Sequence, residues 1–74
     1  MRCFDTDFFK VVSACYQAGT ISSSDRKNYL EEWREGAKSD RKETMALVLE
    51  EIKLMAPEYL VPSINRLVEN INSI

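Results

Sequence analysis

Apolar positions recur with a helical period in four segments of the chain, which short polar or proline-containing stretches separate. The longest segment, residues 40–56, reads DRKETMALVLEEIKLMA. At about 100° per residue, one broad face of this segment is apolar. That face contains Met45, Val48, Leu49, Ile52, Met55 and Ala56. A stripe of this kind is typical of an amphipathic helix that packs against a core.

The first segment predicts a helix over residues 6–18. Asp5 is expected to be its N-cap, which places Phe4 and Phe9 in the positions of a hydrophobic staple. Gly19 follows the helix and suits the left-handed residue that often ends one. The predicted buried stripe, widened by two aromatic residues at its margins, consists of Phe8, Phe9, Val11, Val12, Cys15, Tyr16 and Ala18.

The second and third helices are predicted over residues 24–35 and 40–55. Ser22 and Asp25 have the spacing of a capping box, and Gly36 is expected to end the second helix. The third helix is expected to start near Ser39 or Asp40. The second helix is strongly charged, with a narrow apolar stripe of Tyr29, Leu30, Trp33 and Ala37.

The last helix is predicted over residues 62–72, after a kink at 57–62 that Pro57 and Pro62 frame. Its inner face is Leu60, Ile64, Leu67, Val68, Ile71 and Ile74. Because no segment alternates with a period of two, we expect no strands. The chain is therefore predicted to be a single all-α domain, residues 1–74, folded as a compact bundle of four short helices with antiparallel neighbours.

The composition adds constraints on stability and location. A chain of 74 residues buries a small core and commonly needs a covalent staple or a partner subunit. Cys3 and Cys15 are expected to lie farther apart than the roughly 7 Å between Cα atoms that a disulfide allows. Self-association is the favoured source of further burial. The N-terminal residues do not resemble a signal peptide and no apolar run approaches about 18 residues, so a cytoplasmic protein is expected.

The residue types argue against catalysis and against cofactor or metal binding. The chain has no histidine, its two cysteines do not form a CxxC motif, and its two glycines are isolated. These features remove histidine-activated nucleophiles, a cysteine zinc site and a phosphate-binding loop. We expect a non-enzymatic protein with no cofactor and no metal.

The second helix carries the first candidate for a binding surface. Tyr29 and Trp33 stand among charged residues, and aromatic side chains are frequent anchors of interfaces. The alternative is that Trp33 covers the core. Glu31, Glu32 and Glu35 could face a basic surface of a partner, or they could form a solvated face.

The third helix carries a second candidate. Leu47 and Leu54 are two turns apart and point away from the main apolar stripe. They are either buried by a neighbouring helix or form a ridge for a homodimer or another partner.

The sequence predicts a small protein–protein interaction module, a regulator or inhibitor that occupies a surface of a larger macromolecule. Examples of such a module, named by analogy with other short proteins, are an antitoxin, an immunity protein and a phage-type inhibitor such as an anti-CRISPR protein. The alternative is a weak helix-turn-helix DNA-binding regulator that uses Lys38, Arg41 and Lys42. A net charge of −2 gives little attraction for nucleic acid, so this alternative ranks second.

Overall fold

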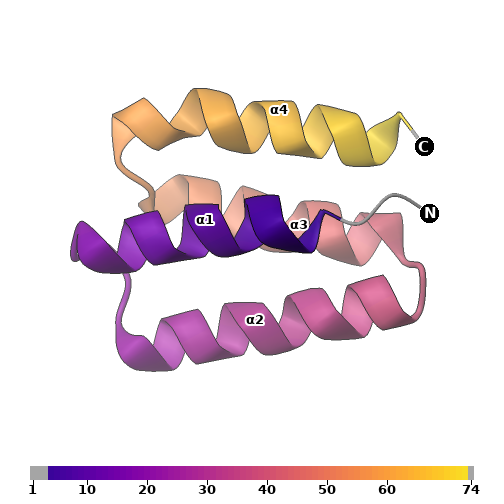
Figure 1. Cartoon of the computed structure of the whole chain (residues 1–74), viewed down its shortest axis with the longest axis horizontal. Coiled ribbons are helices and arrows are strands. Elements are labelled where there is room, and N and C mark those ends of the chain that lie inside the picture. Colours follow the sequence, from indigo (N-terminus) through magenta and orange to yellow (C-terminus); the bar gives the residue numbers. More distant parts are fainter. Residues whose placement is uncertain (1–3, 74) are drawn as a thin grey trace.

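A computed structural model describes residues 4–73, and in this range the chain has four α-helices and one short 3-10 helix (Figure 1). The α-helices are α1 (Asp5–Gln17), α2 (Ser23–Lys38), α3 (Lys42–Met55) and α4 (Val61–Asn72), and the 3-10 helix η1 (Glu58–Leu60) directly precedes α4. No strand occurs among the described residues. The predicted all-α bundle is confirmed. The predictions for Cys3 and Ile74 lie outside the described residues.

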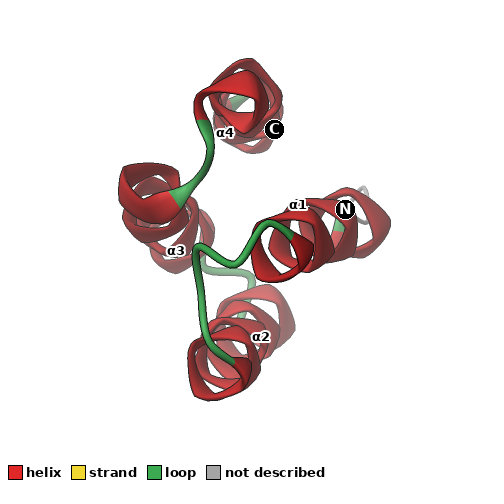
Figure 2. Cartoon of the chain, turned by 90° about the vertical axis from the view of Figure 1, so that its left-hand side faces the viewer, coloured by secondary structure: helices red, strands yellow, loops and turns green. Residues whose placement is uncertain are grey.

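Successive helices run antiparallel, so the chain passes back and forth along the bundle (Figure 1). Seen end-on, α1 and α3 lie between α2 and α4 (Figure 2). The contacts of α3 with α2 and with α4 are the most extensive, and those of α1 with α2 and with α4 are fewer. The long apolar segment of the sequence is thus the helix on which two others pack.

The core between α1 and α2 is organised around Trp33, whose side chain is 1% exposed. The indole stacks on the ring of Phe8, with ring centroids 4.1 Å apart and an interplanar angle of 8°. Its Nε1–H donates a hydrogen bond to Asp5 Oδ1 at 2.8 Å. The only polar atom of the largest core side chain is therefore paired, as burial of an N–H group requires.

The start of α1 differs from the prediction. Its N-cap is Phe4, which is buried, and no side chain caps the helix. Asp5 is the first helical residue, because its carboxylate accepts from the indole of Trp33 instead of from the backbone of its own helix. The predicted staple is also wrong: Phe8, not Phe9, lies four residues after the N-cap, and Phe9 is 40% exposed.

The buried stripes are narrower than the sequence indicated. The helix margins turn toward solvent, and the residues predicted to be buried but found exposed are Phe9, Tyr16, Ala18 and Met55. Two of them still make specific contacts. The Tyr16 ring lies 5.4 Å from the guanidinium carbon of Arg26, and the Met55 sulfur accepts a hydrogen bond from the Tyr29 hydroxyl at 3.5 Å.

The predicted ends of α1 and α2 are confirmed where the capping chemistry is local. Gly19 adopts φ +78° and follows α1. The Ser22 hydroxyl accepts from the backbone N–H of Asp25 at 3.1 Å, and the Asp25 carboxylate accepts from the backbone N–H of Ser22 at 3.2 Å. Together these two bonds are the capping box that the sequence predicted.

Gly36 does not end α2, contrary to the prediction; it lies inside the helix and is buried. A Cβ atom at this position would be 3.0 Å from Met45 Cγ and 3.2 Å from Thr44 Cβ. The glycine thus lies at a close approach of α2 to α3. The helix continues to Lys38 because this packing compensates for the low helix propensity of glycine.

The turn between α2 and α3 spans residues 39–41 and is a Schellman motif. Asp40 takes the left-handed position with φ +54°, and its N–H donates to Ala37 O at 3.2 Å. The N–H of Arg41 donates to Gly36 O at 2.8 Å. Asp40 therefore ends α2 and does not cap α3, whose N-cap is Arg41. At the other end of α3, the predicted break at Pro57 is confirmed, with η1 filling the kink.

The hydrogen bond between Trp33 and Asp5 predicts an asymmetry between two first-turn acids of α1. Asp5→Ala leaves the buried indole N–H without an acceptor and should lower the free energy of unfolding by about 1–3 kcal/mol. Asp7→Ala removes a similar charge from the same helix end, where its interaction with the helix dipole is worth about 0.3–1 kcal/mol. Urea denaturation followed by circular dichroism measures both. Equal losses would show that the indole bond contributes nothing.

The close approach at Gly36 predicts overpacking on substitution. Gly36→Val should lower the free energy of unfolding by about 1–3 kcal/mol, because the new methyl groups collide with Thr44 and Met45. Arg34→Val introduces the same side chain at an exposed position of α2 and should cost under about 1 kcal/mol. Thermal and urea denaturation compare the two. A Gly36→Val protein as stable as the Arg34→Val protein contradicts the tight contact.

Candidate interaction groove

An open groove of about 540 Å³ lies between α2 and α3. It is lined by Glu31, Glu32 and Glu35 from α2 and by Thr44, Leu47, Val48 and Glu51 from α3. We call this set the acidic groove. The structure thus brings the acidic cluster predicted on the second helix next to one leucine of the ridge predicted on the third.

The residues from α3 share one face of that helix. Thr44, Leu47, Val48 and Glu51 follow the spacing of three, four and seven residues that places side chains in one row. Val48 is buried and belongs to the core, whereas Leu47 is 63% exposed. Full burial of a leucine side chain is worth about 1.5–3 kcal/mol. Leu47 therefore offers apolar contact area that the chain itself does not use.

Four carboxylates surround this leucine: Glu31, Glu32, Glu35 and Glu51. All four are exposed, and within residues 4–73 none of them has an ion-pair partner. Lys53 pairs with Glu50 at 3.8 Å, and neither residue lines the groove. The carboxylates of the groove are thus free of ion pairs within the described residues.

Two of these carboxylates also act on the hydroxyl of a buried tyrosine, Tyr29. Burial raises the pKa of the Tyr29 hydroxyl above its ordinary value, and the nearby carboxylates of Asp25, Glu51 and Glu32 raise it further. Two of these three carboxylates line the acidic groove. With four exposed carboxylates in its lining, the groove concentrates negative charge.

Tyr29 and Trp33 do not contribute to an exposed binding face, contrary to one of the predicted alternatives. Tyr29 is 9% exposed and Trp33 is 1% exposed, and both belong to the core. Trp33 is held by Phe8 and Asp5, while Tyr29 donates its hydroxyl hydrogen to Met55. The two aromatic residues fix the orientation of α2 and so position its glutamates.

The ridge of Leu47 and Leu54 faces solvent, because no other helix among residues 4–73 covers it. Leu54 is 89% exposed and lies beyond the acidic groove, toward the end of α3. Met55 and Tyr59, close by in the sequence, are also exposed. The alternative that a neighbouring helix buries the two leucines is thus wrong, whereas contact with a partner stays a prediction.

The basic residues Lys38, Arg41 and Lys42 do not form the helix-turn-helix that the sequence allowed. The connection is three residues long, but α2 and α3 run side by side and antiparallel (Figure 1). A helix-turn-helix instead crosses its helices at about 90–120°. Arg41 and Lys42 share a depression with Asp40 and Glu43, and Lys42 is half-buried and takes part in an intramolecular interaction.

Glu51 and Thr44 are members of the groove that the sequence analysis did not single out. Thr44 lies three residues before Leu47 and Glu51 lies four residues after it, and this helical spacing was a usable signal. It was weak because Glu50 and Glu51 are adjacent, and only the packing of α3 on α2 decides which of them faces the groove.

Other kinds of site are not evident in the described part of the chain. Among residues 4–73, no three cysteine or acidic side chains gather into a group that could hold a metal ion. None of the helices in this range has the length and apolar character needed to cross a membrane. Comparisons with protein-family models, with curated proteins and with solved structures found no match to this chain.

The buried Tyr29 and Cys15 predict a loss of stability at alkaline pH. Burial raises the pKa of the Cys15 thiol, as it does for the Tyr29 hydroxyl. Both groups therefore lose their protons at lower pH in the unfolded chain than in the folded one, and the unfolded chain binds fewer protons between the two values. The stability that these two groups contribute should be fully present below about pH 8 and be lost as pH rises past about 10.

Denaturation by urea at a series of pH values measures this dependence. A Tyr29→Phe variant should show a smaller alkaline loss than the wild-type protein, and a Tyr59→Phe variant, at an exposed position, should show the same loss as the wild type. A Tyr29→Phe protein with an unchanged pH profile would contradict the role of Tyr29.

Proposed function

We propose that this chain is a non-enzymatic protein–protein interaction module that binds a basic surface of a larger partner through the acidic groove. The observation that carries the proposal is the combination at one place of an exposed leucine, Leu47, with four carboxylates that have no ion-pair partner within residues 4–73. Interfaces commonly unite an apolar anchor with a charged rim. Complementary charge on the partner would accelerate and orient the encounter.

The partner that fits the groove carries an apolar side chain flanked by arginine or lysine residues. The apolar side chain would pack on Leu47, and the basic residues would reach the glutamates on both walls. Self-association through this groove is disfavoured, because a twofold interface would place the same four carboxylates of a second copy opposite them. We therefore propose a different protein as the partner, and the predicted homodimer could use only the ridge beyond the groove, at Leu54.

A regulator or inhibitor is the form of activity that suits such a module. By covering basic residues, the chain would block a surface on which another macromolecule binds, for example nucleic acid. Examples of such a regulator, proposed by analogy with other short proteins, are an antitoxin, an immunity protein and a phage-type inhibitor such as an anti-CRISPR protein. A cytoplasmic location belongs to the same proposal.

The test compares two triple variants with the same change in net charge. One carries Glu31→Gln, Glu32→Gln and Glu35→Gln in the groove, and the other carries Glu43→Gln, Glu58→Gln and Glu69→Gln outside it. Each removes three negative charges and changes the net charge from −2 to +1. The groove variant should fold normally, since it removes repulsion between Glu31 and Glu35, which are one helical turn apart.

Affinity capture from the source cells, followed by mass spectrometry, provides the measurement. The wild-type chain and the outer variant should retain the same protein partner, which the groove variant loses. Elution should occur at moderate salt, because the attraction between solvent-exposed charges weakens as the ionic strength rises. Retention of the partner by the groove variant would rule out the acidic groove as its binding site.

Leu47 provides an independent check of the apolar part of the proposal. Leu47→Ala should weaken binding of the captured partner by about 1–2 kcal/mol, because it removes most of the apolar side chain. Leu54→Ala, on the same ridge but outside the groove, should leave the affinity unchanged. Calorimetric titration with the purified partner measures the affinity of both variants. Equal losses of affinity would show that the partner contacts the whole ridge and not the groove alone.

A further inference from the structure

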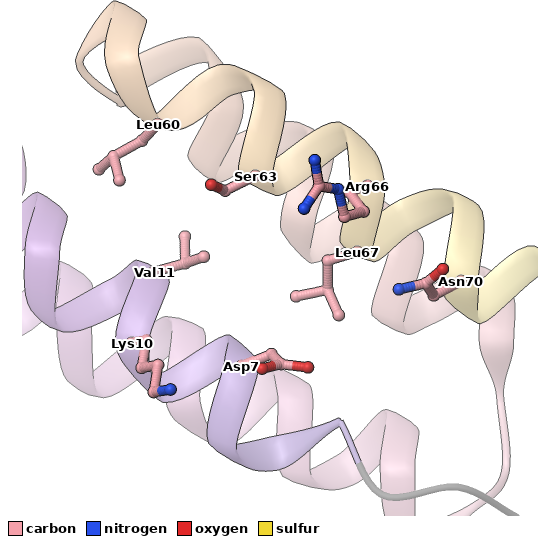
Figure 3. A pocket seen from close by; sticks show the side chains of 8 residues that line it. All are labelled: Asp7, Lys10, Val11, Leu60, Ser63, Arg66, Leu67 and Asn70. Carbon is pink, nitrogen blue, oxygen red and sulfur yellow. The ribbon is translucent and has the colours of Figure 1, made fainter.

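A second cavity, a cleft of about 280 Å³, lies between α1 and α4 (Figure 3). These two helices make few contacts with each other, so their side chains do not close the space between them. Val11 from α1 and Leu60 and Leu67 from α4 form its apolar part. Val11 and Leu67 are buried core residues whose outer surfaces form the floor. The volume is just below that of typical small-molecule sites, about 300–1,000 Å³.

Five polar side chains surround this floor. Asp7 and Lys10 come from α1, and Ser63, Arg66 and Asn70 come from α4, as Figure 3 shows. All five are exposed, and within residues 4–73 none of them makes a hydrogen bond or an ion pair through its side chain. Their donors and acceptors are therefore available to a ligand.

The charge of this cleft is opposite to that of the acidic groove. Lys10 and Arg66 contribute two positive charges from opposite walls, and Asp7 contributes one negative charge. The sum is +1, in a chain whose net charge is −2. Positive potential between two helices over an apolar floor selects for a ligand that has one anionic group and an apolar body.

We propose that the cleft binds a small monocarboxylate with an apolar body. The carboxylate would accept two hydrogen bonds from the guanidinium of Arg66, whose geometry matches that of a carboxylate, and Lys10 on the opposite helix would add electrostatic attraction. The apolar body would cover Val11, Leu60 and Leu67. Asp7 disfavours a second negative charge, and the cleft of about 280 Å³ accommodates a small apolar body. This site is independent of the acidic groove and of the function proposed for it.

Three compounds with the same body and different charge test the proposal: 4-phenylbutyrate, 4-phenylbutyramide and 4-phenylbutylamine. Each is titrated into the ¹⁵N-labelled chain, and shifts of backbone amide signals are followed by NMR. Phenylbutyrate should shift signals of α1 and α4 with a Kd of about 1 mM, the affinity expected for a ligand of this size. The amide should bind there about fivefold more weakly, and the amine should leave these signals unchanged.

Two charge variants locate the effect. Lys10→Gln combined with Arg66→Gln should lower the affinity for phenylbutyrate to that of the neutral amide. Arg34→Gln combined with Lys53→Gln removes the same charge outside the cleft and should leave the affinity for phenylbutyrate unchanged. The dispersion of the amide spectrum reports whether each variant is folded. The comparison of the three compounds on the wild-type chain does not depend on any variant.

Three results would overturn the proposal. One is equal binding of the acid, the amide and the amine, which would reduce the cleft to a non-selective apolar surface. Another is the absence of shifts in α1 and α4 at about 10 mM phenylbutyrate, tenfold above the expected Kd. The third is a shift that persists unchanged in the cleft variant.

Discussion

The indole of Trp33 is fixed on two sides, by the ring of Phe8 and by the carboxylate of Asp5, and the position of α2 depends on it. An aromatic pair of this kind adds about 0.5–1.5 kcal/mol beyond the area that it buries. Such an amount matters in a chain of 74 residues, whose total stability is small. Because the indole points inward, Glu31 and Glu35, two residues before and after it, emerge on the opposite side of the helix.

The close contact at Gly36 is the second constraint on which the acidic groove depends. With no side chain between them, Gly36 of α2 and Thr44 of α3 approach closely, and the two helices remain adjacent along their length. The contact at Gly36 therefore fixes the position of Leu47 and Glu51 of α3 relative to the glutamates of α2. A bulkier residue at this position would separate the walls of the groove as well as strain the core.

The bundle also separates charge between two faces. The acidic groove between α2 and α3 is lined by four carboxylates and no cation, whereas the cleft between α1 and α4 is lined by two cations and one carboxylate. Each cavity joins its charges to exposed or partly exposed apolar surface. The low net charge of the chain therefore conceals two local fields of opposite sign, which suit different kinds of ligand.

The sequence by itself determined the helices and those of their ends that depend on local chemistry. The 3.6-residue period, the capping box at Ser22, the left-handed glycine at Gly19 and the break at Pro57 all involve residues a few positions apart, so they were predictable. Whether the ridge at Leu54 is exposed was left open by the sequence. A helical period shows which residues share a face of the helix, but it does not show whether another helix packs on that face.

Only the tertiary structure decided the roles that depend on contacts between helices. The Asp5 carboxylate accepts a hydrogen bond from the indole of Trp33, 28 residues away, and does not cap its own helix. Gly36 lies inside α2 and does not end it, because α3 packs against the glycine. For the same reason Trp33, which the charge pattern left between core and surface, is buried. The acidic groove and the cleft each join residues of two helices. Their composition follows from how the helices pack, which a pattern along one helix does not specify.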